Sequence, residues 1–362
     1  DGTTVKKGYE TILANNGGAA SMTTLTSTDF ATATTASDKG MYKAQDDLGT
    51  SYYFRGAVDN NWVKYGKYTK DAYITVDSND NYSLVDSCNG LNLCVKLASK
   101  GDDMYWRIIR VNGDNSIRMI YTGTSAPDNN TKVVMTESIN SSGYIRATSA
   151  GMSKFNQNFD SAEYVGYMYE IGKQHGTSQS SDIKTYLEDW YANYTDLNAS
   201  ETKITDQIFC NDRTSSTDSS GIPGEISSWA STGTAYYYGS YYRVVEKYST
   251  PMPSLICDNA NDKFTTTTAK GNGKLSYPIG LITADEVNMA GASSNQSYYL
   301  YNENSYWGGS PFDFSDDGAY ESSVDIDGHL SGGFVSESGG VRGVVSLSSE
   351  SKLLGSGTYN DV

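Results

Sequence analysis

Side chains that could carry out acid–base or nucleophilic catalysis are scarce in this sequence. Its only histidines are His175 and His329, and it contains no His-Glu-x-x-His motif, no Gly-x-Ser-x-Gly motif and no Gly-rich phosphate loop after a strand. One catalytic set can be assembled by residue type, with Cys210 as thiolate nucleophile, His175 as acid–base group and Arg213 as oxyanion-stabilising cation. Because the established motifs are missing, the sequence favours a protein without enzymatic activity.

Tyrosine supplies the most distinctive binding chemistry of the chain. Thirty tyrosines occur among many serines, glycines and asparagines. Adaptable binding surfaces use this mixture, because a rigid ring with one hydroxyl gives contact area at low entropy cost. Exposed strands also favour tyrosine, so an ordinary structural role stays open.

The four cysteines fall into two candidate pairs. Cys88 and Cys94 bracket a turn-rich segment, while Cys210 and Cys257 each end a strand-like run before an Asn/Asp-rich turn. An even number of cysteines in an exported composition favours two disulfides, although four cysteines allow three pairings. A zinc site made by all four cysteines is the alternative, and it is disfavoured because neither pair has the short spacing of a zinc knuckle.

The composition excludes several kinds of partner. The chain has 362 residues, and its 27 Lys plus Arg against 43 Asp plus Glu give a net charge of −16. This charge repels phosphate backbones and anionic lipid surfaces, so no nucleic acid or membrane surface is expected as a partner. No run of eighteen apolar residues occurs, so the chain is not expected to insert into a membrane. Many Gly, Ser, Thr, Asn and Tyr with few charged residues are typical of an extracellular, loop-rich, β-dominated protein.

The elements that would position these side chains are mainly short strands. Runs rich in aromatic and β-branched residues predict strands at Tyr52–Phe54, Trp62–Tyr65, Ala72–Val76, Met104–Val111 and Ser116–Tyr121. The last two runs predict a hairpin, because Asn112-Gly113 between them favours the positive φ angles that tight turns need.

Two helices are expected among these strands. The first runs over residues 181–194, with Ser181 or Asp182 as cap and one apolar face formed by Ile183, Leu187, Trp190, Tyr191 and Tyr194. The second begins after Thr283, whose hydroxyl forms a capping box with Glu286. Few helices among many short strands predict an α+β, β-dominated fold with mixed short-strand sheets.

Residues 1–40 differ from the rest of the chain. They are rich in Thr, Ser, Ala and Gly, with too little apolar surface to offset their own ordering entropy. This N-terminal arm is therefore expected to be either a flexible stalk or a segment that binds a partner surface, for example as an added strand on a neighbouring subunit. Residues 41–270 are expected to form a β-rich domain that packs as one unit with a C-terminal segment, 271–362.

Several motifs along the chain resemble a large group of exported, mostly uncharacterised proteins of gut-dwelling Gram-positive anaerobes. The matching motifs span residues 46–57, 105–110, 164–168, 208–213, 271–278 and 280–286. Many members of that group are similar to pilins, with a processed apolar helix at the N-terminus. The resemblance covers roughly residues 41–358 and implies surface display and assembly into a filament, but no reaction. This chain departs from the group in lacking the apolar pilin helix.

The last third of the chain resembles the C-type-lectin-like fold in its bacterial form, which formylglycine-generating-enzyme-like domains share. The resemblance is carried by the segments 280–287, 306–311 and 339–347, although Gly343 stands where proline is frequent. It implies that ligands bind on loops, and it makes candidates of Tyr298, Tyr299, Tyr301, Asn302, Asn304, Tyr306 and Trp307. Trp307 is alternatively a core residue, and Arg342 is expected to be a buried ion-pair residue and not a ligand contact.

No metal or cofactor is predicted. The Glu-Pro-Asn and Gln-Pro-Asp loops with which C-type lectins hold calcium are missing, as is their Trp-Asn-Asp strand. An acidic cluster in the C-terminal segment is expected to consist of solvated turn residues, with a structural calcium site as the unsupported alternative; it comprises Asp313, Asp316, Asp317, Asp325 and Asp327. The copper-binding cysteines of the oxidase relatives have no counterpart in the matching core.

These inferences lead to an extracellular surface protein, associated with a pilus or filament, that mediates attachment through a C-type-lectin-like domain. Its expected partners are copies of itself in a filament, or a ligand on a host or microbial surface. The alternative is a structural filament subunit whose N-terminal arm joins neighbouring subunits. A cysteine transpeptidase or hydrolase ranks third.

Overall fold

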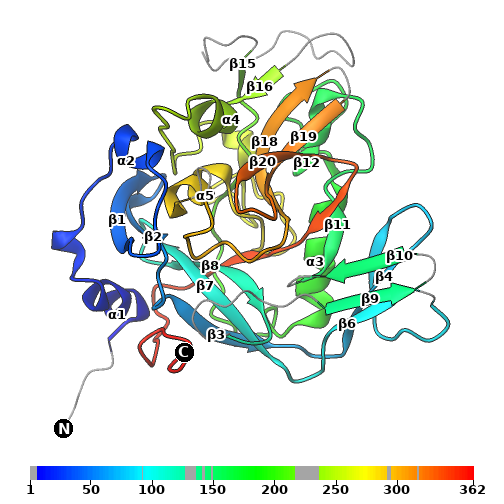
Figure 1. Cartoon of the computed structure of the whole chain (residues 1–362), viewed down its shortest axis with the longest axis horizontal. Helices are drawn as coiled ribbons and strands as arrows, with labels where there is room; N and C mark the ends of the chain where they lie inside the picture. Colours follow the sequence, from blue (N-terminus) through cyan, green and yellow to red (C-terminus); the bar gives the residue numbers. More distant parts are fainter. Residues whose placement is uncertain are drawn as a thin grey trace.

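The chain is a β-dominated α+β protein that combines several antiparallel and mixed sheets with a few helices (Figure 1). The computed structural model describes residues 6–91, 93–126, 136–140, 143–147, 150–216, 236–291, 295–315 and 318–362. The fold class expected from the sequence is therefore confirmed at this level.

A six-stranded sheet joins the two ends of the chain. Its strands are β1 (Lys39–Asp46), β2 (Gly49–Gly56), β3 (Trp62–Lys67), β7 (Asp103–Val111), β8 (Ile117–Gly123) and β22 (Val344–Leu347). They follow the order β1-β2-β7-β8-β22, and β3 also pairs with β7. Since β22 pairs antiparallel with β8, the C-terminal segment completes a sheet that the N-terminal half begins.

The predicted hairpin is β7–β8, but its turn differs from the expectation. The positive φ of 67° lies at Asn115, not at Gly113, because a longer loop closes with Asn112 N donating to Ser116 O. Gly113 is needed for a different reason, since a Cβ there would lie 2.3 Å from the Gly49 nitrogen. The hairpin turn thus packs directly against the turn between β1 and β2.

A seven-stranded sheet contains most of the strands of the C-terminal segment. Its strands are β11 (Met152–Lys154), β15 (Ser215–Ser216), β16 (Tyr236–Tyr238), β18 (Tyr306–Ser315), β19 (Gly318–Val324), β20 (Leu330–Phe334) and β21 (Ser338–Gly340). The long strands β18 and β19 form its centre, with β-bulges in their pairing around Pro311.

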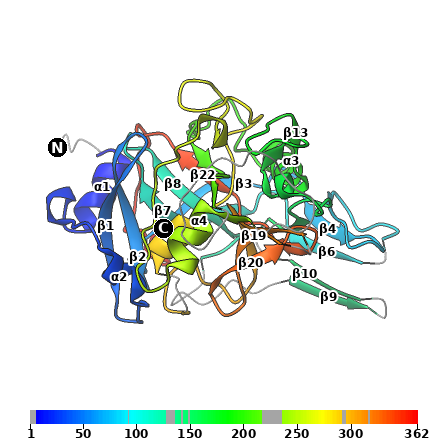
Figure 2. The ribbon, with the colours of Figure 1, turned by 90° about the horizontal axis from the view of Figure 1, so that it is seen from above.

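Smaller sheets extend from these two. A three-stranded sheet consists of β4 (Ala72–Val76), β5 (Tyr82–Val85) and β6 (Cys94–Ala98). The two-stranded sheets are β9 (Thr136–Asn140) with β10 (Gly143–Ala147), β12 (Met168–Tyr169) with β13 (Gln179–Ser180), and β14 (Phe209–Cys210) with β17 (Lys263–Phe264). In both ribbon views, β4, β6, β9 and β10 lie at the end of the molecule opposite α1 and β1 (Figures 1 and 2).

Both predicted helices are confirmed with their caps. Helix α3 (Asp182–Tyr194) begins at Ser181, whose hydroxyl accepts from Lys184 N, and its apolar face is buried in the core. Helix α5 (Ala284–Ala290) begins with the Thr283–Glu286 capping box and buries all seven of its residues. The shorter helical elements are α1 (Gly8–Asn15), η1 (Ala19–Ser21), α2 (Ser27–Ala31), η3 (Ala162–Val165), α4 (Gly239–Tyr241), η4 (Tyr242–Glu246) and η5 (Ala260–Asp262).

The described part of the N-terminal arm, residues 6–38, lies against its own chain. Ile12, Met22 and Phe30 are buried there. The small apolar groups of this segment are therefore stabilised by packing against the rest of the chain. Arg55 of β2 donates to backbone carbonyls near the C-terminal ends of both α2 and α5. A cation at a helix C-terminus is favourable, so this one side chain ties the arm to the body.

Two disulfides are present, with the pairing expected from the sequence. Cys88 and Cys94 have Cα atoms 5.6 Å apart, and Cys210 and Cys257 have Cα atoms 5.7 Å apart. All four sulfurs are thereby used, so none remains as a thiolate ligand for zinc.

Candidate functional site

A cavity of about 510 Å³ lies where distant parts of the chain meet. Its lining residues are Ala36, Lys39, Ala57, Asp59, Trp62, Arg107, Thr122, Gln296, Ser297, Tyr298, Tyr299, Tyr301, Asn302, Arg342, Thr358 and Tyr359. We name it the tyrosine–arginine cavity. Exposed residues such as Lys39, Asp59 and Gln296 mark its mouth, while Arg107, Tyr299 and Arg342 form buried parts of its wall.

The candidates expected from the sequence divide into two groups. Tyr298, Tyr299, Tyr301 and Asn302 line the tyrosine–arginine cavity, whereas the other three do not. Those three are buried and have structural contacts: Asn304 N donates to Asn302 Oδ1, Tyr306 Oη donates to Leu300 O, and Trp307 Nε1 donates to Ser153 O. Trp307 lies in the core, which confirms the alternative prediction for this residue.

Backbone contacts hold the loop that carries the four lining candidates. Tyr299 N donates to Gly56 O at 3.0 Å, which fixes the loop to the end of β2. Tyr298 Oη donates to Gly328 O at 2.9 Å, which ties the loop to the turn before β20. The tyrosines therefore occupy fixed positions in the cavity wall.

Arg107 is a lining residue that the sequence did not identify as functional. It belongs to β7 and is 2% exposed, with Nε donating to Asn61 Oδ1 and Nη2 to Val58 O. Its guanidinium lies 4.4 Å from the ring centroid of Trp62 and 5.5 Å from that of Tyr299. Burial lowers the pKa of Arg107 to about 9, so the group is still charged at pH 7. The available signal was an arginine between the apolar residues Trp106 and Ile108 of a predicted strand.

Arg342 was expected to be a buried ion-pair residue, and only its burial agrees with that expectation. It is 1% exposed, yet it forms no ion pair within the described ranges. Its donors bond to Tyr121 O, Leu300 O and Thr122 Oγ1, and its guanidinium lies 4.7 Å from the ring centroid of Tyr306. Strand-end and loop carbonyls thus take the place of a carboxylate, and the positive charge is not neutralised by them.

Two buried polar atoms of the lining residues have no hydrogen-bond partner in the described part of the chain. They are Tyr299 Oη and Asn302 Nδ2, on residues that are 5% and 4% exposed. A buried polar group without a partner costs roughly 1–3 kcal/mol, and most such groups in proteins are satisfied by protein or water. The two atoms themselves are closed off from the cavity, although other atoms of Tyr299 and Asn302 belong to its wall.

The charged residues of the lining are unequal in number. Lys39, Arg107 and Arg342 are cations, and Asp59 is the single carboxylate among them. Lys39 and Asp59 form a 2.9 Å ion pair at the mouth, where both side chains are about half exposed. The buried part of the cavity is therefore positive in a protein whose net charge is −16.

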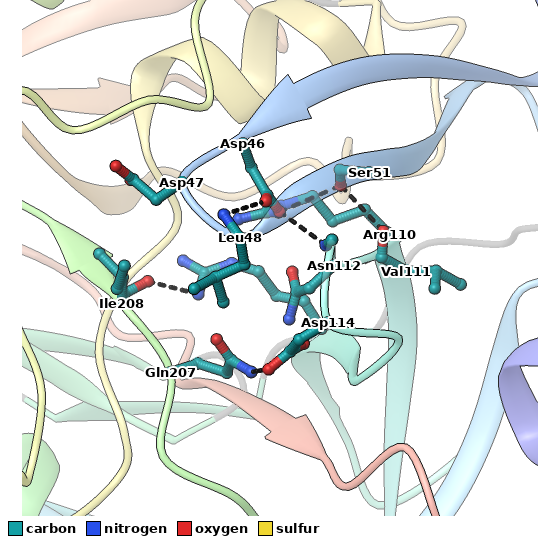
Figure 3. Close-up of polar contacts among 12 residues, drawn as sticks. Asp46, Asp47, Leu48, Ser51, Arg110, Val111, Asn112, Asp114, Gln207 and Ile208 are labelled. Carbon is teal, nitrogen blue, oxygen red and sulfur yellow. Dashed lines mark hydrogen bonds and ion pairs between the residues drawn. The ribbon is translucent and has the colours of Figure 1, made fainter. Parts of the chain in front are cut away.

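A second group of charged residues lies at the hairpin turns (Figure 3). Arg110 pairs with Asp46 at 2.7 Å and with Glu286 at 3.0 Å, and Glu286 also pairs with Arg118 at 2.6 Å. Burial alone would raise the pKa of Glu286, but the two arginines lower it. This cluster holds the β1–β2 turn, the β7–β8 hairpin and α5 together.

The space beside this cluster is small. Its cavity volume is about 30 Å³, roughly the room of one water molecule. Its polar groups are bonded to one another: Gln207 donates to Asp114 (Figure 3), and Arg118 donates to Ile208 O. We therefore assign the cluster a structural role and take the tyrosine–arginine cavity as the candidate site.

The residues of the catalytic alternative are engaged in other contacts. Cys210 is bonded to Cys257, so the thiolate that a cysteine transpeptidase needs is absent. His175 Nδ1 lies 2.9 Å from Asp262 Oδ2, and Arg213 pairs with the same carboxylate at 2.6 Å. Asp262 thus ties these two residues together as a buried structural pair.

The acidic C-terminal residues were expected to be turn residues. Asp325 Oδ1 accepts from Asp327 N and His329 N, each at 2.9 Å, so Asp325 shapes the turn before β20. Asp313 lies within β18 and not in a turn, so the expectation was wrong for this residue, and Asp316 and Asp317 lie outside the described residues. Within the described ranges, no group of three or more His, Cys, Asp or Glu side chains is placed to hold a metal ion.

Comparison with known proteins adds no family to this picture. No protein-family model, no curated protein and no solved structure matches the chain. Among the described residues, no helix has the length and apolar character needed to cross a membrane.

Proposed function

We propose that this protein is an extracellular surface protein that attaches to a ligand on a host or microbial surface through the tyrosine–arginine cavity. The carrying observation is that aromatic and polar side chains, among them Tyr298, Tyr299 and Asn302, line an open cavity of about 510 Å³. Sites for small ligands have volumes of roughly 300–1,000 Å³ and combine aromatic walls with a few converging polar groups. The cavity has this character.

One further feature supports the proposal. Disulfides form and persist mainly in oxidising, extracytoplasmic compartments, and this chain has two of them. In the proposed protein, residues 271–362 are the C-type-lectin-like part and the loop over 295–305 presents the ligand. The molecule would be displayed on a cell or on a filament, with the mouth of the cavity turned outward.

Blocking the mouth of the cavity tests this function. Gln296 is exposed and lines the cavity, so Gln296→Trp should fill the entrance without disturbing the core. Gln179→Trp is the matched control, because Gln179 is also exposed but does not line the cavity. Both variants and the unaltered chain would be applied to glycan arrays and to intact cells.

The proposed function predicts that the unaltered chain and Gln179→Trp bind the same targets and that Gln296→Trp loses them. Equal binding by all three proteins would place attachment elsewhere on the surface. Absence of binding by the unaltered chain to every target would contradict the attachment function itself.

A further inference from the structure

Four Asn-Gly pairs occur in the chain, and they begin at Asn16, Asn89, Asn112 and Asn272. Such a pair can modify itself, because the main-chain nitrogen of the glycine can attack the side-chain carbonyl carbon of the asparagine and close a five-membered ring. Glycine hinders this attack least, since it has no side chain. The attack needs an asparagine amide and a glycine N–H that are free to approach each other. The tertiary structure therefore decides which of the four pairs can react.

Hydrogen bonds hold both groups in three of the four pairs, those of Asn16, Asn112 and Asn272. The Nδ2 atoms of the three asparagines donate at 2.8 Å to Ile12 O, Ser116 Oγ and Asn261 O, in that order. The nitrogens of the three following glycines donate at 3.3, 2.9 and 3.1 Å to Ala14 O, Asp46 Oδ2 and Thr265 Oγ1. Each of these pairs must break its hydrogen bonds before it can react, so the structure protects it.

The pair Asn89-Gly90 is held by no such bonds. The two residues are the central positions of a turn in which Leu91 N donates to Cys88 O at 3.1 Å, and Gly90 has the positive φ of 79° that the second central position of a type II turn requires. Both residues are exposed, and within the described ranges neither the Asn89 amide nor Gly90 N has a hydrogen-bond partner. A Cβ on Gly90 would meet no atom within 4 Å, so the turn has room to rearrange.

We propose that Asn89 is a site of spontaneous modification, at which the side-chain amide is lost as ammonia. Gly90 N forms a bond to Asn89 Cγ, the Cγ–Nδ2 bond breaks, and the proton of Gly90 N leaves with the amide nitrogen. One water molecule then opens the ring. Opening at Cγ gives aspartate, and opening at the main-chain carbonyl gives isoaspartate, in which the main chain runs through the side chain. Water is the only other reactant.

The modification changes one exposed loop, between β5 and β6. Either product adds a carboxylate to a chain whose net charge is already −16. Isoaspartate also adds a methylene group to the main chain inside the ring that the Cys88–Cys94 disulfide closes. Neither Asn89 nor Gly90 lines the tyrosine–arginine cavity, so this inference is independent of the proposed attachment function.

The test compares the four pairs within one protein. Trypsin cleaves after lysine and arginine, so the four asparagines fall in different peptides, residues 8–39, 71–96, 111–118 and 271–274. The full chain with intact disulfides is incubated in mildly alkaline buffer, then reduced, digested and analysed by mass spectrometry, with chromatography to separate aspartate from isoaspartate peptides. We expect Asn89 to be converted at least roughly tenfold faster than the other three, because they must first break their hydrogen bonds.

Two controls accompany this measurement. In the reduced chain in urea, where the protecting hydrogen bonds are lost, the four asparagines should be converted at similar rates. Asn89→Gln keeps an amide at the same position but would need a larger ring, so the variant should lose ammonia there far more slowly, with the other three sites unchanged.

Three results would overturn the inference. The first is conversion of Asn16, Asn112 or Asn272 in the folded chain at a rate equal to or above that of Asn89. The second is the same advantage of Asn89 in urea, because the local sequence and not the structure would then select the site. The third is conversion of Asn89 without any isoaspartate, since direct hydrolysis of the amide gives aspartate alone.

Discussion

At the scale of single residues, the structure contains a buried carboxylic acid that has no counter-charge in contact. Glu321 of β19 is 0% exposed, and neither of its carboxylate oxygens has a hydrogen-bond partner in the described ranges. Its neighbour across the strand pair is Pro311, which has no N–H to donate. Burial raises the pKa of Glu321 well above its usual value, although the charge of Arg213 opposes this.

The raised pKa of Glu321 should make the folded protein less stable as the pH rises. Glu321 is protonated in the folded chain and ionised in the unfolded chain at pH values between the two pKa values. Folding therefore takes up a proton there, and stability is lost as pH rises through the folded pKa. The loss has a slope of up to about 1.4 kcal/mol per pH unit.

Glu321→Gln should remove this loss while keeping the size of the side chain. We expect the free energy of unfolding of the variant to exceed that of the unaltered chain at pH 8, and to vary less between pH 5 and 8. Urea unfolding at a series of pH values measures both quantities. Parallel pH profiles for the two proteins would show that Glu321 is ionised in the folded state.

At the scale of elements, two turns are held in contact at the strand ends of the six-stranded sheet. The β7–β8 hairpin turn meets the β1–β2 turn at Gly113 and Gly49, and Asp46 Oδ2 accepts from Gly113 N at 2.9 Å. Arg110 and Glu286 connect the same region to α5. Close backbone approach, and not turn conformation, is thus what requires glycine at position 113.

Gly113→Ala should therefore destabilise the protein, because the added methyl group would overlap the backbone of the neighbouring turn. Overpacking of this kind costs roughly 1–3 kcal/mol. Gly40→Ala is the control, since a Cβ there would make only ordinary contacts, with its nearest atoms at 3.4 Å on Tyr42. Urea unfolding should show a lower free energy for Gly113→Ala alone; an equal change in both variants would contradict the packing argument.

At the scale of the whole molecule, residues 6–38 form part of the body. Phe30 is buried with Tyr53 and Met289, and Gly8 N donates to Ser351 O at 2.6 Å near the other end of the chain. Figure 2 shows α1, α2 and β1 together at one end of the molecule. A segment in this position contributes to the stability of the single chain.

A variant that begins at Lys39 should accordingly be less stable. Losing three buried apolar side chains, Ile12, Met22 and Phe30, removes on the order of 5 kcal/mol. Phe30→Ala, which keeps the length and charge of the segment, should give about 3–5 kcal/mol. Urea unfolding measures both losses.

Electron microscopy of the same variants addresses the filament alternative. If the full chain forms filaments while the variant beginning at Lys39 stays discrete and equally stable, the segment acts between subunits. If both proteins are equally stable and neither forms filaments, residues 6–38 contribute neither to stability nor to assembly.

The sequence by itself determined the local structure. The caps of α3 and α5 and the Cys88–Cys94 disulfide each depend on residues only a few positions apart. Such interactions are recognisable from residue type and spacing, because few other partners are within reach. The same holds for the β7–β8 hairpin, although the position of its positive φ angle depended on the packing around Gly113.

Only the tertiary structure decided the candidate site. The sequence marked the tyrosine loop, but it did not separate Tyr299 and Asn302, which line the cavity, from Tyr306 and Trp307, which are buried in the core. Arg342 was expected to have a carboxylate partner and has carbonyls instead. The cavity wall combines residues from positions 36 to 359, and which side chains reach that wall depends on the packing of many distant segments. No local pattern encodes that property, because it depends on how all the elements pack.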